Sequence, residues 1–204
     1  MSDGADTGYR ALVDELAALV RLAHAALAGA TAVLTDPADG GDGIPAAEKA
    51  LADLLSRIEE DAAVAPGGRA GTVVAVHVGC EVETLGRLAQ RLLEAAWARR
   101  EREPFDGRLR TPLRGLAGAA LDLVARCADI LETGAPEGVA DVPAALHEVA
   151  RRQRLLYGLL RGGEGTDPVD AVDLVDLVVL ACCYQQCADR AGAVARHAAL
   201  FARP

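Results

Sequence analysis

The sequence predicts an all-α protein built from two tandem three-helix bundles, with six helices and an internal repeat. Alanine and leucine supply most of the 51% of residues that are hydrophobic, and aromatic residues make up only 3%. Such side chains favour helices, whereas sheets are enriched in β-branched and aromatic residues. In addition, apolar residues recur at three- and four-residue steps along the chain, which is the period of a helix face.

Three helical segments are expected in the first half. The first runs from about residue 7 to 34 and carries leucines on one face. The stretch TDPADGGDG ends it. The second opens at Pro45, a preferred first helical position, and stops at APGG, residues 65–68. The third is long, from about residue 71 to 102.

The second half follows the same plan. A helix over 111–131 is expected to begin at Thr111, a good cap, followed by Pro112 at the first helical position. The next helix spans about 142–160. The last begins near Pro168, with Asp167 as its cap, and continues to about Phe201. No strand pattern interrupts these segments.

The two halves align with each other, which predicts a repeated structural unit. The last long segment matches the third with a shift of 102 residues, and the fourth matches the first with a shift of 97. The aligned pairs include Val76 with Val178, Val78 with Leu180, Cys80 with Cys182, Ala89 with Ala191, Leu16 with Leu113, and Leu27 with Val124. We therefore expect one three-helix repeat over residues 7–103 and a second over 108–202.

Charge and composition narrow the function classes. The formal net charge is −9, which disfavours phosphate-rich nucleic acids and anionic membrane surfaces as partners. No signal peptide is visible, and the longest fully apolar run, 177–184, is too short to cross a bilayer. The five cysteines form no disulfide framework. A cytoplasmic protein without membrane insertion is expected.

Several stretches resemble the PhoU family of phosphate-signalling regulators. The strongest is CYQQCADRAGAVARH, residues 183–197, which is similar to the family's last helix. CEVETLGRLAQRL, residues 80–92, resembles the matching part of the third helix, and AAEKALADLLSRIEE resembles the second. YRALVDELAALVRLAHAALAGATAVL resembles the opening helix. The resemblance covers nearly the whole chain and rests on the order and spacing of the six segments.

This resemblance implies a function as well as a fold. It implies a cytoplasmic protein, often a homodimer, that negatively regulates phosphate uptake and the phosphate-starvation response. It also implies two protein partners, the ATPase subunit of a phosphate ABC transporter and a membrane sensor kinase. On this interpretation the protein is a regulatory adaptor and not an enzyme.

Members of the family often carry an acid followed four residues later by aspartate, once in each half. Carboxylates at that spacing share one helix face and suit iron, manganese or magnesium. Here Glu83 is kept but its partner position holds Arg87, and Asp189 is kept but its partner position holds Gln185. Arginine offers no lone pair. Glu83 and Asp189 are therefore weak metal candidates, and we expect no resident metal or other cofactor.

We expect the remaining cysteines and histidines to have structural roles. Cys183 and Cys187 lie four residues apart and are expected to be small buried hydrophobes. The four histidines are scattered, and the chain has no GxxxxGK[ST] phosphate loop. Two alternatives to the adaptor remain open: a metal-binding helical-bundle protein, and a divergent PhoU-like paralogue with a different partner.

Overall fold

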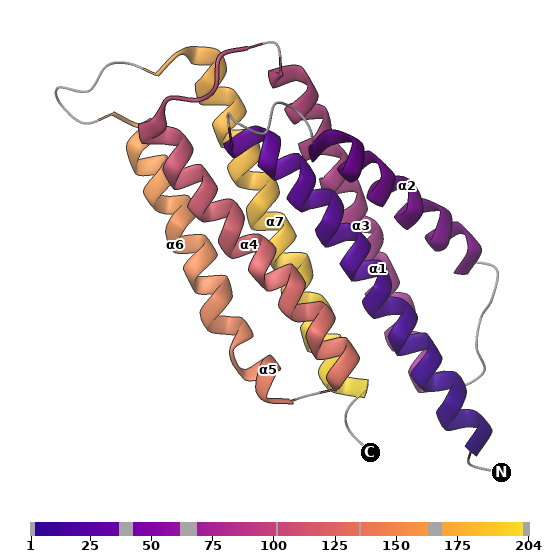
Figure 1. Ribbon diagram of the computed structural model, residues 1–204. Coiled ribbons are helices and arrows are strands. Elements are labelled where there is room, and N and C mark those ends of the chain that lie inside the picture. Colours follow the sequence, from indigo (N-terminus) through magenta and orange to yellow (C-terminus); the bar gives the residue numbers. More distant parts are fainter. Residues whose placement is uncertain are drawn as a thin grey trace.

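The structure is a computed structural model that describes residues 3–36, 43–61, 69–100, 102–134, 136–162 and 169–201. All regular structure within these residues is helical, which confirms the predicted fold class (Figure 1). Its six long helices are α1 (Asp3–Thr35), α2 (Gly43–Asp61), α3 (Arg69–Arg99), α4 (Gly107–Thr133), α6 (Val142–Leu160) and α7 (Ala171–Phe201). A five-residue helix, α5 (Pro136–Ala140), is an addition that the sequence analysis does not predict.

The two halves use the same helix contacts. Helix α1 packs against both α2 and α3, and α4 packs against both α6 and α7. The halves join where α1 meets α4 and where α3 meets α7. Helices α1, α3, α4 and α7 therefore form a central four-helix bundle, with α2 and α6 on its outer sides (Figure 1).

Burial repeats between the halves as the alignment predicts. The aligned pairs Leu16 with Leu113, Leu27 with Val124, Val78 with Leu180, Ala89 with Ala191 and Leu92 with Val194 are buried in both members. The aligned pair Val76 and Val178 is instead exposed, each residue in its own half. One continuous hydrophobic core spans both halves, so the repeats are packed together as one body.

The start of α4 differs from the prediction. The helix begins at Gly107, and the Asp106 side chain caps it by accepting a hydrogen bond of 3.0 Å from the backbone N–H of Arg108. Phe105 is buried just before this cap. Pro112 consequently lies inside the helix instead of opening it. The Thr111–Pro112 signal was wrong because Asp106 caps an earlier turn.

The other predicted boundaries lie close to the observed ones. Helix α6 spans the predicted residues, with Pro143 in its first turn, and Gly134 ends α4 in the left-handed conformation at φ 64°. The predicted cap of the last helix, Asp167, lies outside the described residues. Within them, the Asp170 side chain accepts a hydrogen bond of 3.1 Å from the backbone N–H of Val172 at the start of α7.

Candidate functional site

The acidic motif residues lie on α3 and α7, the helices that join the two halves. Arg87 binds Glu83 in an i, i+4 ion pair of 2.5 Å, and both side chains are about half exposed. On α7 the Gln185 amide donates to the Asp189 carboxylate over 3.1 Å. Each retained acid is therefore engaged by the residue that replaces its carboxylate partner.

Glu83 does not face the α3–α7 seam. Glu81 does, because its carboxylate accepts a hydrogen bond of 3.1 Å from Arg190 on α7. Residues two apart on a helix point in nearly opposite directions, so Glu83 is turned away from α7. Across the described ranges, no three His, Cys, Asp or Glu side chains gather closely enough to hold one metal ion. Whether the protein carries metal stays a prediction.

The cysteines of α4 and α7 are mostly buried. Cys127, Cys183 and Cys187 are each less than 5% exposed. Burial raises the pKa of Cys127 to about 12 and also raises the pKa values of Cys183 and Cys187. Because the thiolate is the reactive form, these three thiols are poor nucleophiles and poor metal ligands at neutral pH.

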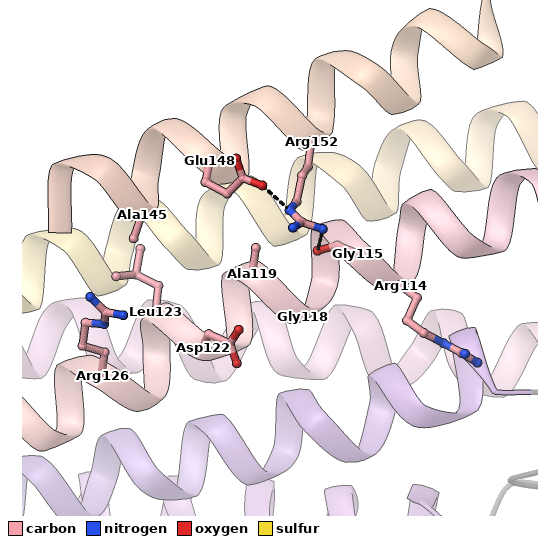
Figure 2. A pocket seen from close by; sticks show the side chains of 10 residues that line it. All are labelled: Arg114, Gly115, Gly118, Ala119, Asp122, Leu123, Arg126, Ala145, Glu148 and Arg152. Carbon is pink, nitrogen blue, oxygen red and sulfur yellow. Dashed lines mark hydrogen bonds and ion pairs between the residues drawn. The ribbon is translucent and has the colours of Figure 1, made fainter. Parts of the chain in front are cut away.

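A groove between α4 and α6 is a concave surface that carries both charged and apolar side chains. Its first hollow has a volume of about 380 Å³ and is lined on the α4 side by Gly115, Gly118 and Ala119, which Figure 2 labels. Ala145 and Glu148 on α6 line the other wall. The groove is hollow because α4 presents glycine and alanine where larger side chains would fill the space.

Arg152 bridges the two walls of this groove. Its guanidinium donates to Glu148 over 2.7 Å and to the backbone carbonyl of Gly115 over 3.1 Å (Figure 2). A Cβ on residue 115 would lie 2.7 Å from the guanidinium, so glycine makes room for Arg152. Hydrogen bonds from Arg151 and Arg152 lower the pKa of Glu148 to about 2. Glu148 is therefore ionised at neutral pH and holds both arginines in place.

The groove continues into a second hollow of about 650 Å³ towards the α6 C-terminus. Leu155 and Leu159 line it, and their side chains are 54% and 49% exposed. Two neighbouring leucines with this much exposed surface form an apolar patch, which is typical of an interaction site. Arg154 and Gly158 lie beside them. The two hollows share Gly115 and Arg152, so they form one continuous surface, here called the α4–α6 groove.

The α4–α6 groove is locally basic although the chain is acidic. The side chains that line its two hollows include five arginines, Arg114, Arg126, Arg151, Arg152 and Arg154, and two acids, Asp122 and Glu148. The chain as a whole has 21 basic and 30 acidic residues. The whole-chain charge therefore misrepresents this surface, and a site on it favours anionic ligands.

The sequence analysis missed this groove. The usable signal was the run of Arg151, Arg152 and Arg154 in one segment, with Arg114 in another. Their proximity depends on the antiparallel packing of α4 against α6, which the separate segments do not reveal. Gly118 of α4 also looks like an ordinary small residue until the structure shows the open space beside it.

Comparison with known proteins adds no assignment. No protein-family model matches this chain, and no curated protein matches it. The resemblance to the PhoU family therefore rests on the segments quoted above.

Two of the described helical segments, Arg10–Thr35 and Ala171–Ala199, are long and apolar enough to cross a membrane by length and composition alone. Both belong to the central bundle, where core helices have this composition. Location in the cytoplasm stays a prediction.

Proposed function

We propose that this protein is a regulatory adaptor that resembles the PhoU family and restrains phosphate uptake and phosphate-starvation signalling by binding other proteins. The order and spacing of its six helical segments carry the proposal. The same set of helix contacts in each half supports it, because the resemblance implies a tandem three-helix plan.

The proposal assigns binding to the protein and not catalysis. An adaptor of this kind needs a rigid surface whose shape and charge fit a partner's. The continuous core that joins the two halves supports such rigidity, and the α4–α6 groove offers a concave surface with its own charge. By the resemblance, the partners are the ATPase subunit of a phosphate ABC transporter and a sensor kinase, and the adaptor is a homodimer in the cytoplasm.

Deletion of the gene tests this function. We expect phosphate uptake, or the output of the phosphate-starvation pathway, to rise in phosphate-replete medium, because the restraint is removed. Complementation with the intact gene should restore the original level. An unchanged phosphate response, in a genome without a second copy, would favour the divergent paralogue with a different partner.

A further inference from the structure

We propose that the α4–α6 groove binds an acidic amphipathic helix of a partner protein. The proposal rests on the adaptor function above and names the kind of segment that the adaptor recognises. Its basis is the shape, the exposed leucines, the local charge and the open glycines of the groove.

The shape of the groove fits one helix. The groove runs along α6 from Ala145 to Leu159, which at 1.5 Å per residue is about 21 Å, or roughly four turns of a partner helix. Its walls are two packed helices, α4 and α6. A helix laid between them would pack its side-chain ridges into their grooves, as helices in bundles do.

The apolar anchors lie in one half of the groove. Leu155 and Leu159 are four residues apart on one face of α6, and each leaves about half of its surface in solvent. Thr111 and Pro112 of α4 line the same hollow. A partner helix with leucine-like residues at three- and four-residue spacing would cover both leucines and bury apolar area on each side.

The charge of the groove selects an acidic partner. Arg154 is exposed beside the leucines, and within the described residues no carboxylate contacts it. Arg151 and Arg152 are held at the groove by Glu148. Asp122 is the second acid among the lining residues, which include five arginines. Glutamates that flank the apolar face of a partner would pair with the remaining positive charge.

Two glycines point to close approach by another backbone. Gly118 on α4 and Gly158 on α6 both line the groove, and a Cβ on either would have no neighbour within 4 Å. Glycine inside a helix is less stable than alanine. Packing within this chain does not require glycine at either site, whereas an incoming helix gains close contact from it.

A partner helix fits these features better than a membrane or a second copy of this chain. An anionic bilayer is flat and would meet the net charge of −9 of the whole protein. The hollows, in contrast, are concave. Self-association and vesicle binding are nevertheless measured, because each would use the same arginines.

The test uses full-length protein and a synthetic peptide of about 14 residues, matched to the groove length. The peptide repeats leucine at three- and four-residue spacing and carries glutamate at its other positions. We expect saturable binding that weakens as salt rises. A peptide of the same composition with scrambled leucine positions should bind at least about tenfold more weakly, because its leucines no longer share one face.

Four variants locate the binding. Arg154→Glu should weaken peptide binding about tenfold, whereas Arg91→Glu, the same change on the exposed face of α3, should leave it unchanged. Gly158→Ala should raise the thermal midpoint and still weaken binding. Gly79→Ala on α3, where the space beside the glycine is equally open, should raise the midpoint without affecting binding. A loss of binding in a more stable protein cannot come from unfolding.

Several outcomes would overturn the proposal. These are no saturable binding of the acidic peptide, equal weakening by Arg154→Glu and Arg91→Glu, or a groove-dependent change in the oligomeric state. Arg154-dependent binding to phosphatidylglycerol vesicles, without peptide binding, would assign the groove to a membrane instead. The groove and the adaptor function fail separately: the deletion phenotype tests the function, and the peptide titration tests the groove.

Discussion

Two side chains form a polar contact inside the mostly apolar core. Tyr184 on α7 is fully buried, and its hydroxyl lies 2.9 Å from the Thr31 hydroxyl on α1. Thr31 itself donates to the Leu27 carbonyl over 2.7 Å, so the Tyr184 hydroxyl is the donor to Thr31. Burial raises the pKa of Tyr184, and the phenol stays neutral at physiological pH.

This contact predicts unequal costs for its two partners. Tyr184→Phe removes one hydrogen bond but leaves Thr31 bonded to Leu27, so we expect a loss of about 1 kcal/mol in the free energy of unfolding. Thr31→Val leaves the buried phenol without an acceptor and should cost more, about 1–3 kcal/mol. Urea unfolding of both variants and of the double variant measures this. Equal costs, or additive ones, would contradict the hydrogen bond.

The replaced motif residues give a prediction about metal. We expect the purified, untagged protein to carry well under one iron or manganese per chain. A divalent ion about 6 Å from the Arg87 guanidinium would be repelled by about 5 kcal/mol at an effective dielectric of 20. Arg87→Asp combined with Gln185→Glu should raise metal uptake, because each helix then presents two carboxylates at i, i+4 spacing. Elemental analysis measures the metal content per chain of the natural protein and of the double variant. Stoichiometric multinuclear metal in the natural protein would contradict the first.

At the scale of elements, an ion network of four residues connects the C-terminal end of α3 to the N-terminal end of α7. Arg99 contacts Asp173 over 2.8 Å and Asp176 over 3.1 Å, and Arg102 contacts the same two carboxylates. The Arg99 guanidinium also lies 3.4 Å from the centre of the Phe105 ring. Because α3 belongs to the first half and α7 to the second, these ion pairs stabilise the contact between the two repeats at one end of the molecule.

The two arginines of this network should contribute unequally. The Arg99 side chain is 9% exposed, whereas that of Arg102 is 37% exposed. We expect Arg99→Met to lower the free energy of unfolding by about 2 kcal/mol, since it loses desolvated charge contacts and a cation–π contact. Arg102→Met should cost less than about 1 kcal/mol. Chemical denaturation of the two variants compares them, and a larger loss for Arg102→Met would refute the assignment.

The helices were largely predictable because their signals are local. Apolar periodicity located all six long helices, and the 142–160 segment matches α6 from end to end. The prediction failed at α4, where two capping signals compete and tertiary packing of Phe105 favours the earlier one. It also missed α5, since a five-residue helix is too short to show a period.

The candidate site was less predictable because it depends on packing between helices. The resemblance to the PhoU family pointed to the acidic motif positions, and the pairing of Arg87 with Glu83 is the consequence expected of their i, i+4 spacing. The α4–α6 groove depends on which residue of α4 faces which residue of α6. The hydrogen bond from Arg152 to the Gly115 carbonyl joins positions 37 apart in the chain, and no local pattern sets that distance.

At the scale of the whole molecule, net charge and local charge lead to different expectations. From the net charge of −9 alone, the protein would be steered towards basic partners. The arginines of α4 and α6 create a basic surface within this acidic body, and short-range contacts there are set by the local charge. An acidic partner helix would therefore be held by the groove while the rest of the surface repels it, which favours one orientation of binding.

The continuous core also leads to a prediction about how the molecule unfolds. The single tryptophan, Trp97, lies in the first half, where its indole N–H donates to Glu48 on α2 over 3.0 Å. Its fluorescence therefore reports on α2 and α3. Because one core spans both halves, we expect this signal and far-UV circular dichroism to give the same denaturation midpoint, as in two-state unfolding.

A change in the second half makes the test decisive. Leu113 on α4 is fully buried, and Leu113→Ala should lower the free energy of unfolding by about 2–5 kcal/mol. If the halves unfold together, the Trp97 midpoint falls as far as the circular dichroism midpoint, although Trp97 lies in the other repeat. Leu155→Ala, at a half-exposed position on α6, serves as the control and should move neither midpoint appreciably. A Trp97 transition that stays in place while the circular dichroism curve splits into two steps would show that residues 7–103 and 108–202 unfold as independent domains.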